Sequence, residues 1–124
     1  MYDQNAAELI GTIVEAPRYK KTENTGKAKV DFVMKIHRQS SPSSYDRVYV
    51  TAWESVAEQI KEAYGEGDRI AVRGKINVSS YKNGDQYHFF TRVVAEEVSI
   101  PSEKKEDGFG YVKVPEEKKV EKSV

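Results

Sequence analysis

The 124-residue chain contains no cysteine, which excludes a disulfide framework, a thiolate zinc site and a cysteine nucleophile. No apolar run approaches the roughly 18 residues that a membrane-spanning helix needs. The first eight residues lack the basic-then-apolar order of a signal peptide. We therefore expect a soluble protein of a cytoplasm-like compartment, with no membrane partner and, at this length, one domain.

The chain also lacks an excess of charge of either sign, since twenty Lys and Arg balance twenty Asp and Glu. A neutral chain at first argues against nucleic-acid binding, because a basic net charge is its usual footprint. Residues 9–50, however, carry eight basic and four acidic side chains, and residues 69–92 carry five basic and one acidic. Residues 51–68 carry five acidic and one basic. Neutrality is thus a cancellation between segments, and it does not exclude a basic groove.

Composition divides the chain at about residue 100. Residues 102–124 are dominated by Lys and Glu and hold too few apolar residues to form a core. We therefore interpret residues 1–100 as the single domain and residues 101–124 as a charged, disordered tail.

Alternating hydrophobicity predicts five strands, and one segment has a different period. Residues 54–64 carry apolar side chains at helical spacing, and Gly65 and Gly67 follow as stop signals. Asn83-Gly84 predicts a tight hairpin turn. An all-β five-stranded OB barrel, with a short helix between strands 3 and 4, has this order, although other small mixed folds share it. The predicted strands cover residues 9–14, 30–37, 47–53, 69–78 and 87–98.

The third predicted strand gathers aromatic and basic residues on one face. If its small apolar residues point inward, the outward face carries Tyr45, Arg47, Tyr49, Thr51 and Trp53. Large aromatic area left in water is unfavourable for a surface that binds nothing.

Other aromatic and basic residues are predicted nearby. Tyr81 lies at the mouth of the last hairpin, and Tyr19 lies in the basic stretch 18–21. Rings interleaved with cations can stack on unpaired bases while the cations contact phosphates. The candidate single-strand-binding residues are Trp53, Tyr45, Tyr81, Tyr49, Tyr19, Arg18, Lys20, Arg47, Arg73 and Lys75.

Each of these residues taken alone also has an ordinary structural interpretation. Trp53 could belong to the core at a strand-to-helix junction, and Tyr45 and Tyr49 could pair across strands. The stretch 18–21 could be a solvated turn. Their placement together on one sheet face favours the binding interpretation.

Signals for catalysis are missing from the sequence. His37 and His88 lie on separate predicted strands and share no metal-ligand spacing. There is no phosphate-binding glycine loop, nucleophile elbow or chelating acidic cluster. The sequence therefore predicts a binding protein that is not an enzyme, with no catalytic residue, metal or cofactor.

Four segments, in this order, resemble the bacterial single-stranded DNA-binding protein family: NAAELIGTIVEAPRY (5–19), RVYVTAWESVAE (47–58), GDRIAVRG (67–74) and VAEEV (94–98). The resemblance covers residues 5–100. It implies an OB-fold homo-oligomer, most often a tetramer, that binds single-stranded DNA during replication, recombination and repair in the cytoplasm, at the nucleoid.

The same resemblance assigns roles to individual residues. It places stacking aromatics at Tyr45, Trp53 and Tyr81 and a further aromatic at Tyr19. The matching basic positions are Arg18, Lys20, Arg47, Arg73 and Lys75.

The C-terminal residues depart from the family pattern. Residues 116–124 mix Glu with Lys and lack the acidic stretch and terminal aromatic that recruit replication and repair enzymes in the family. The sequence therefore does not predict whether this protein recruits replication and repair enzymes. Its C-terminal residues fit a phage, plasmid or mobile-element homologue. Two alternative functions also remain: an OB interaction module of a replication or DNA-transfer complex, and an RNA-binding OB domain.

Overall fold

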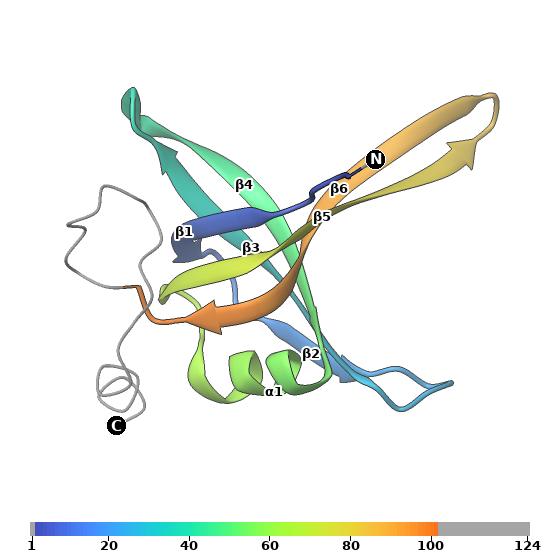
Figure 1. The fold of residues 1–124 in the computed structure, drawn as a ribbon, viewed down its shortest axis with the longest axis horizontal. Helices are drawn as coiled ribbons and strands as arrows, with labels where there is room; N and C mark the ends of the chain where they lie inside the picture. Colours follow the sequence, from blue (N-terminus) through green and yellow to red (C-terminus); the bar gives the residue numbers. More distant parts are fainter. Residues whose placement is uncertain (1, 102–124) are drawn as a thin grey trace.

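The structure, a computed structural model, describes residues 2–101, so all but the first residue of the predicted tail at 101–124 lies outside the described residues (Figure 1). Seven elements follow one another along the chain. They are β1 (Ala7–Ile13), β2 (Arg18–Lys21), β3 (Ala28–Arg38), β4 (Ser41–Trp53), α1 (Glu54–Ala63), β5 (Arg69–Asn83) and β6 (Gln86–Ser99).

The strands form one sheet in the order β1-β5-β6-β4-β3-β2, and β1 also pairs with β3. This second pairing closes the sheet into a barrel, and α1 packs across one end of it against β3, β4 and β6 (Figure 1). The predicted all-β barrel and its helix between the third and fourth long strands are confirmed. The barrel removes most free strand edges, which an open sheet would leave unpaired.

The interior of the barrel is filled by the inward residues of the alternating strands. Full burial of one such side chain stabilises the fold by about 1.5–3 kcal/mol. Ala57 and Ile60 of α1 are completely buried, so the apolar face of the helix closes the core. The largest fully buried side chains are Ile13, Met34, Ile60, Ile70, Val30, Val50 and Val72.

Two segments differ from the predicted boundaries. Arg18–Lys21 forms the short strand β2, which pairs with β3, before the predicted turn over residues 22–27. That turn is closed by the hydrogen bond from Thr22 N to Lys27 O, with Gly26 at φ +69°. The predicted loop over residues 39–44 is mostly strand, because β4 begins at Ser41. Serine residues can extend a hairpin through backbone hydrogen bonds alone. A search for alternating hydrophobicity does not detect such a strand, because the serine side chains are all polar.

Gly74 of β5 allows the barrel to close. The β5–β6 register shifts between Arg73 and Gly74, which is a β-bulge where a bend was predicted. A Cβ atom at residue 74 would collide with the backbone carbonyl group of Val94. The two backbones therefore approach more closely than any side chain permits.

Two long hairpins, β3–β4 and β5–β6, extend from the barrel and diverge (Figure 1). The second turns at Gly84, which has φ +68° and is the first of two loop residues, as expected for a tight hairpin. No helix within residues 2–101 is long and apolar enough to cross a membrane.

Candidate nucleic-acid interface

The outward face of the β3–β4 hairpin carries a double row of aromatic and charged side chains, which we call the aromatic ladder. Residues directly opposite in an antiparallel pair point to the same side of the sheet. Five such pairs make the ladder: His37 with Tyr45, Lys35 with Arg47, Val33 with Tyr49, Asp31 with Thr51, and Lys29 with Trp53.

The aromatic members of the ladder are exposed, as the alternation predicts. Tyr45 is 45% exposed, Tyr49 44% and Trp53 38%. Thr51 points the same way but is only 3% exposed. Its hydroxyl donates a hydrogen bond of 2.7 Å to Asp31 Oδ1, so this position lies at the bottom of a depression between the rings. Trp53 is therefore a surface residue, and the core interpretation is wrong.

Cations lie over the rings of the ladder. Lys29 Nζ is 5.3 Å from the centroid of the Trp53 ring, and Lys35 Nζ is 5.2 Å from that of Tyr45. A cation at this distance is attracted by the ring quadrupole, which favours one ring orientation. The face therefore presents flat rings and positive charge together, with Arg47 between Tyr45 and Tyr49 on β4.

The ladder continues onto the β5–β6 hairpin. The ring of Phe90 on β6 lies 5.0 Å from that of Tyr49, and Tyr81 stacks on His88 at 5.2 Å. Sequence reasoning missed Phe90 and His88. Phe89 and Phe90 are both apolar, so alternation could not show which faces outward, and only the pairing of β6 with β4 decides it.

Two of the predicted basic residues reach this face through β2. Arg18 lies opposite Asp31, and Lys20 lies opposite Lys29. They extend the ladder by one strand and add positive charge near Trp53. The structure thus brings together seven of the predicted residues: Tyr45, Arg47, Tyr49, Trp53, Tyr81, Arg18 and Lys20.

Tyr19 points to the other side of β2, toward the helix, so the structure does not place it on the ladder. It lies opposite the buried Val30, and its hydroxyl donates a 2.5 Å hydrogen bond to Glu58 Oε2 of α1. Lys61 Nζ lies 4.2 Å from the ring. The hydrogen bond to Glu58, with burial and the nearby negative charge adding to it, raises the pKa of the Tyr19 phenol.

Arg73 and Lys75 of β5 are engaged by carboxylates. Arg73 bonds to Glu8 at 3.1 Å and to Glu97 at 3.3 Å, while Lys75 lies 3.3 Å from Glu96. These ion pairs offset the positive charge that the sequence suggested for this strand. Both of these β5 cations are therefore occupied by carboxylates of β1 and β6.

The change Tyr19→Phe should destabilise the fold without weakening binding on the ladder. It removes the hydroxyl that joins β2 to Glu58. The pKa of the Tyr19 phenol is raised in the folded state, so its hydrogen bond stabilises the fold fully below the ordinary tyrosine pKa of 10.0. This stabilisation is lost as the pH rises through the raised, folded-state pKa. Urea midpoints of the two proteins should therefore differ at neutral pH and converge in strong alkali. A loss of nucleic-acid affinity at unchanged stability would place Tyr19 at the interface instead.

No group of three or more His, Cys, Asp or Glu within the described part of the chain could hold a metal ion. His37 and His88 both contact tyrosine rings, His37 with Tyr45 at 5.9 Å and His88 with Tyr81. Both histidines are therefore members of the aromatic surface.

The fold and this face together define an OB-fold protein with an exposed aromatic and basic surface. Residues 4–101 match the model of the single-strand binding protein family, and the chain belongs to that family. It is 30% identical over 107 residues to single-stranded DNA-binding protein 1 of Clostridium acetobutylicum, a match covering 82% of this chain and 97% of that protein.

Two further similarities are to proteins of Synechocystis and Synechococcus. A thylakoid-associated single-stranded DNA-binding protein of Synechocystis is 24% identical over 75 residues, 60% of this chain and 58% of that protein. The crystal structure of the SSB domain of a Synechococcus protein superposes with a TM-score of 0.61 at 19% identity, covering 79% of this chain and 97% of that one. The latter confirms the OB fold.

Proposed function

We propose that this protein binds single-stranded DNA with little sequence preference and without catalysis. The observation that carries the proposal is the aromatic ladder, whose outward rings alternate with Lys and Arg on one face of the β3–β4 hairpin. Every base has a flat π face, so stacked rings accept any unpaired base, while a double helix hides those faces. The relatives named for single-stranded DNA binding support the same function.

The ladder suggests a path for the strand. Bases stack on Trp53, Tyr49 and Tyr45 along β4, with Phe90 beside Tyr49, and Tyr81 receives bases at the second hairpin. Lys29 and Lys35 lie over the rings of Trp53 and Tyr45 and, with Arg47, contact the phosphates. The acidic residues of α1 lie at the closed end of the barrel, where they do not oppose the backbone of the strand.

Fluorescence anisotropy tests this proposal with a labelled oligo-dT and a duplex of equal length. The protein should bind oligo-dT in a salt-dependent manner and bind the duplex poorly. Oligo-U as competitor separates DNA from RNA as the preferred ligand. Equal affinity for duplex and single strand would contradict stacking, and absence of binding would favour the interaction-module alternative.

We also propose that the protein forms a homo-oligomer, for which the family resemblance implies a tetramer. The side of the β5–β6 hairpin away from the ladder exposes four apolar residues, between 47% and 71% exposed. Such a patch is unusual on a monomer. The outer edge of β5 is bonded to Asn5 at Ile76, and beyond this residue no strand of residues 2–101 pairs with it. A second copy of the chain can therefore cover both this edge and the apolar patch. The four residues are Ile76, Val78, Tyr87 and Phe89.

The change Val78→Lys should dissociate the oligomer, because it places a charge in the centre of the apolar patch. Light scattering coupled to gel filtration measures the mass of the assembly. Asn77→Lys is the matched control, since residue 77 points to the opposite side of the same strand. A monomeric wild-type protein, or an oligomer that survives Val78→Lys, would contradict this interface.

Roles in replication, recombination and repair, in the cytoplasm at the nucleoid, follow from single-strand binding as part of the same proposal. Binding of oligo-dT that survives replacement of the ladder aromatics would instead favour an OB module acting through protein partners.

A further inference from the structure

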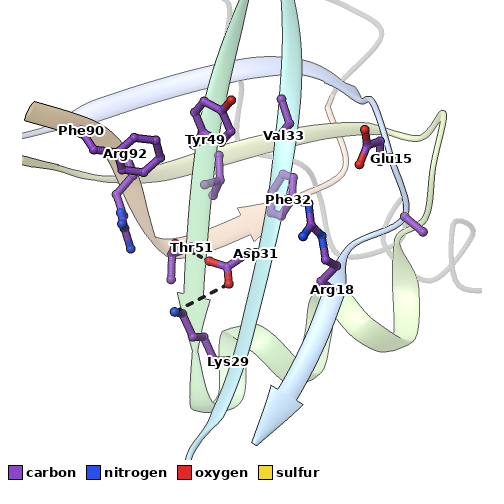
Figure 2. A pocket seen from close by; sticks show the side chains of 12 residues that line it. Glu15, Arg18, Lys29, Asp31, Phe32, Val33, Tyr49, Thr51, Phe90 and Arg92 are labelled. Carbon is purple, nitrogen blue, oxygen red and sulfur yellow. Dashed lines mark hydrogen bonds and ion pairs between the residues drawn. The ribbon is translucent and has the colours of Figure 1, made fainter. Parts of the chain in front are cut away.

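A cavity of about 280 Å³ opens beside the aromatic ladder, between β3, β4 and β6 (Figure 2). Its lining includes the rings of Tyr49 and Phe90 and the polar groups of Asp31, Thr51 and Arg92. Rings form one wall, and the rest of the lining combines charged groups of both signs with apolar residues such as Phe32 and Val33. This combination is richer in hydrogen-bonding groups than nonspecific stacking requires.

Asp31 supplies two acceptors to this cavity. Its Oδ1 accepts the hydroxyl of Thr51 at 2.7 Å, and its Oδ2 lies 3.7 Å from Lys29 Nζ (Figure 2). Each carboxylate oxygen has two lone pairs, so each keeps one for a ligand. The Asp31 side chain is 43% exposed. A carboxylate on this face repels phosphates, whereas it suits the N–H donors of a base edge.

Arg92 supplies guanidinium N–H donors to the same cavity. Its Nε is buried and has no hydrogen-bond partner among residues 2–101. The guanidinium carbon lies 4.9 Å from the centroid of the Phe90 ring, which holds the group against the wall of the cavity. The two terminal nitrogens of the guanidinium carry four further N–H donors, from which a ligand oxygen or ring nitrogen can accept.

Guanine is the base whose edges match this arrangement. Its N1–H and its 2-amino group are adjacent donors that fit the two oxygens of one carboxylate, and its O6 and N7 are acceptors that suit Arg. Adenine and cytosine offer one amino donor beside a ring acceptor. Thymine offers one N–H between two carbonyl oxygens, which would face the carboxylate unfavourably.

We propose that this cavity is a guanine-selective subsite, in which Asp31 accepts the N1–H and 2-amino protons and Arg92 donates to O6 or N7. The inference rests on the proposed single-strand binding. The guanine ring stacks on Tyr49, whose ring is supported by that of Phe90 at 5.0 Å. Binding along the strand is then tolerant of sequence at the other ladder positions and selective at this one.

Competition with modified oligonucleotides tests the subsite on the unaltered protein. The probe is a short oligo-dT in which one central nucleotide is replaced in turn by dG, dI, dA or dC; a single dG also avoids quadruplex formation. We expect the dG oligonucleotide to bind about tenfold more tightly than oligo-dT, within the range of one good base contact. Inosine lacks the 2-amino group, so dI should lose most of the gain. Equal affinity of dG and dA oligonucleotides would overturn the proposal.

The change Asp31→Asn should abolish the preference for dG, measured as the ratio of the affinities for the dG and plain dT oligonucleotides, because the amide offers the guanine edge only one acceptor oxygen. Asp46→Asn is the matched control: Asp46 also pairs with a cation, Arg38 at 2.7 Å, but points to the other side of β4. It should retain the preference. A dG preference that persists in Asp31→Asn would contradict the subsite. If oligo-dT does not bind at all, the proposed function fails; if it binds without a dG preference, only the subsite fails.

Discussion

The double change Trp53→Ala with Tyr49→Ala should lower the affinity for oligo-dT by about 2–6 kcal/mol, since each lost base–ring stack contributes about 1–3 kcal/mol. The two residues are four positions apart on β4, which corresponds to about 13 Å, so they stack on different bases. Changes at this separation are usually additive. The single variants should therefore each show about half of the loss.

Titration of labelled oligo-dT by anisotropy measures these effects. The control is Tyr2→Ala, which removes an exposed tyrosine that precedes β1 and lies off the ladder. Trp53→Phe keeps a flat ring and should recover part of the affinity that Trp53→Ala loses. If the double variant binds as the wild type does, the stacking surface lies elsewhere on the protein.

The second large effect is expected at the β-bulge, where Gly74→Ala should destabilise the fold by about 1–3 kcal/mol, the usual cost of overpacking. The added methyl group would collide with the backbone of Val94, and backbone cannot rotate away as a side chain can. In a domain of this size each kcal/mol corresponds to roughly 4–8 °C in Tm. Thermal unfolding followed by circular dichroism measures the shift.

Gly65→Ala provides the matched control for this substitution. At residue 65 the φ angle is not in the left-handed region, and an added Cβ would meet only the Asp68 carboxylate at 4.0 Å. Its Tm should stay close to that of the wild type. Equal Tm values for the two glycine variants would show that the close approach at Gly74 does not limit closure of the barrel.

The sequence predicts those features that depend on local period. The alternation of β4 predicts that Tyr45, Tyr49 and Trp53 face outward, and the change to helical spacing predicts α1 close to its observed bounds. The Asn83-Gly84 pair predicts the hairpin turn. Each of these features depends on neighbours within a few residues, and such neighbours are visible in the sequence.

Features that depend on pairing between distant strands could not be predicted. Phe90 belongs to the aromatic surface because β6 runs beside β4, and Arg92 lines the cavity for the same reason. Tyr19 faces the helix because β2 pairs with β3 in one register rather than the other. Arg73 meets Glu8 and Glu97 only when three strands come together.

The zero net charge of the chain also has a structural explanation. Acidic residues gather on α1 and beside Arg73 and Lys75, while Lys29, Lys35, Arg47 and Arg18 lie along the ladder. Asp31 is the one acidic member of the ladder, so its basic residues outnumber its acidic ones and a neutral chain still presents a basic strip. Without a long-range basic field, binding should depend more on local stacking than on electrostatic steering.

The fluorescence of Trp53 tests the central claim most directly, because it is the only tryptophan in the chain and lies on the ladder. Oligo-dT should quench this fluorescence as it saturates the protein, and the quenching should reverse as salt displaces the strand. A duplex of equal length should leave the emission nearly unchanged. Saturating binding of oligo-dT with no change in Trp53 emission would contradict stacking of bases on this face.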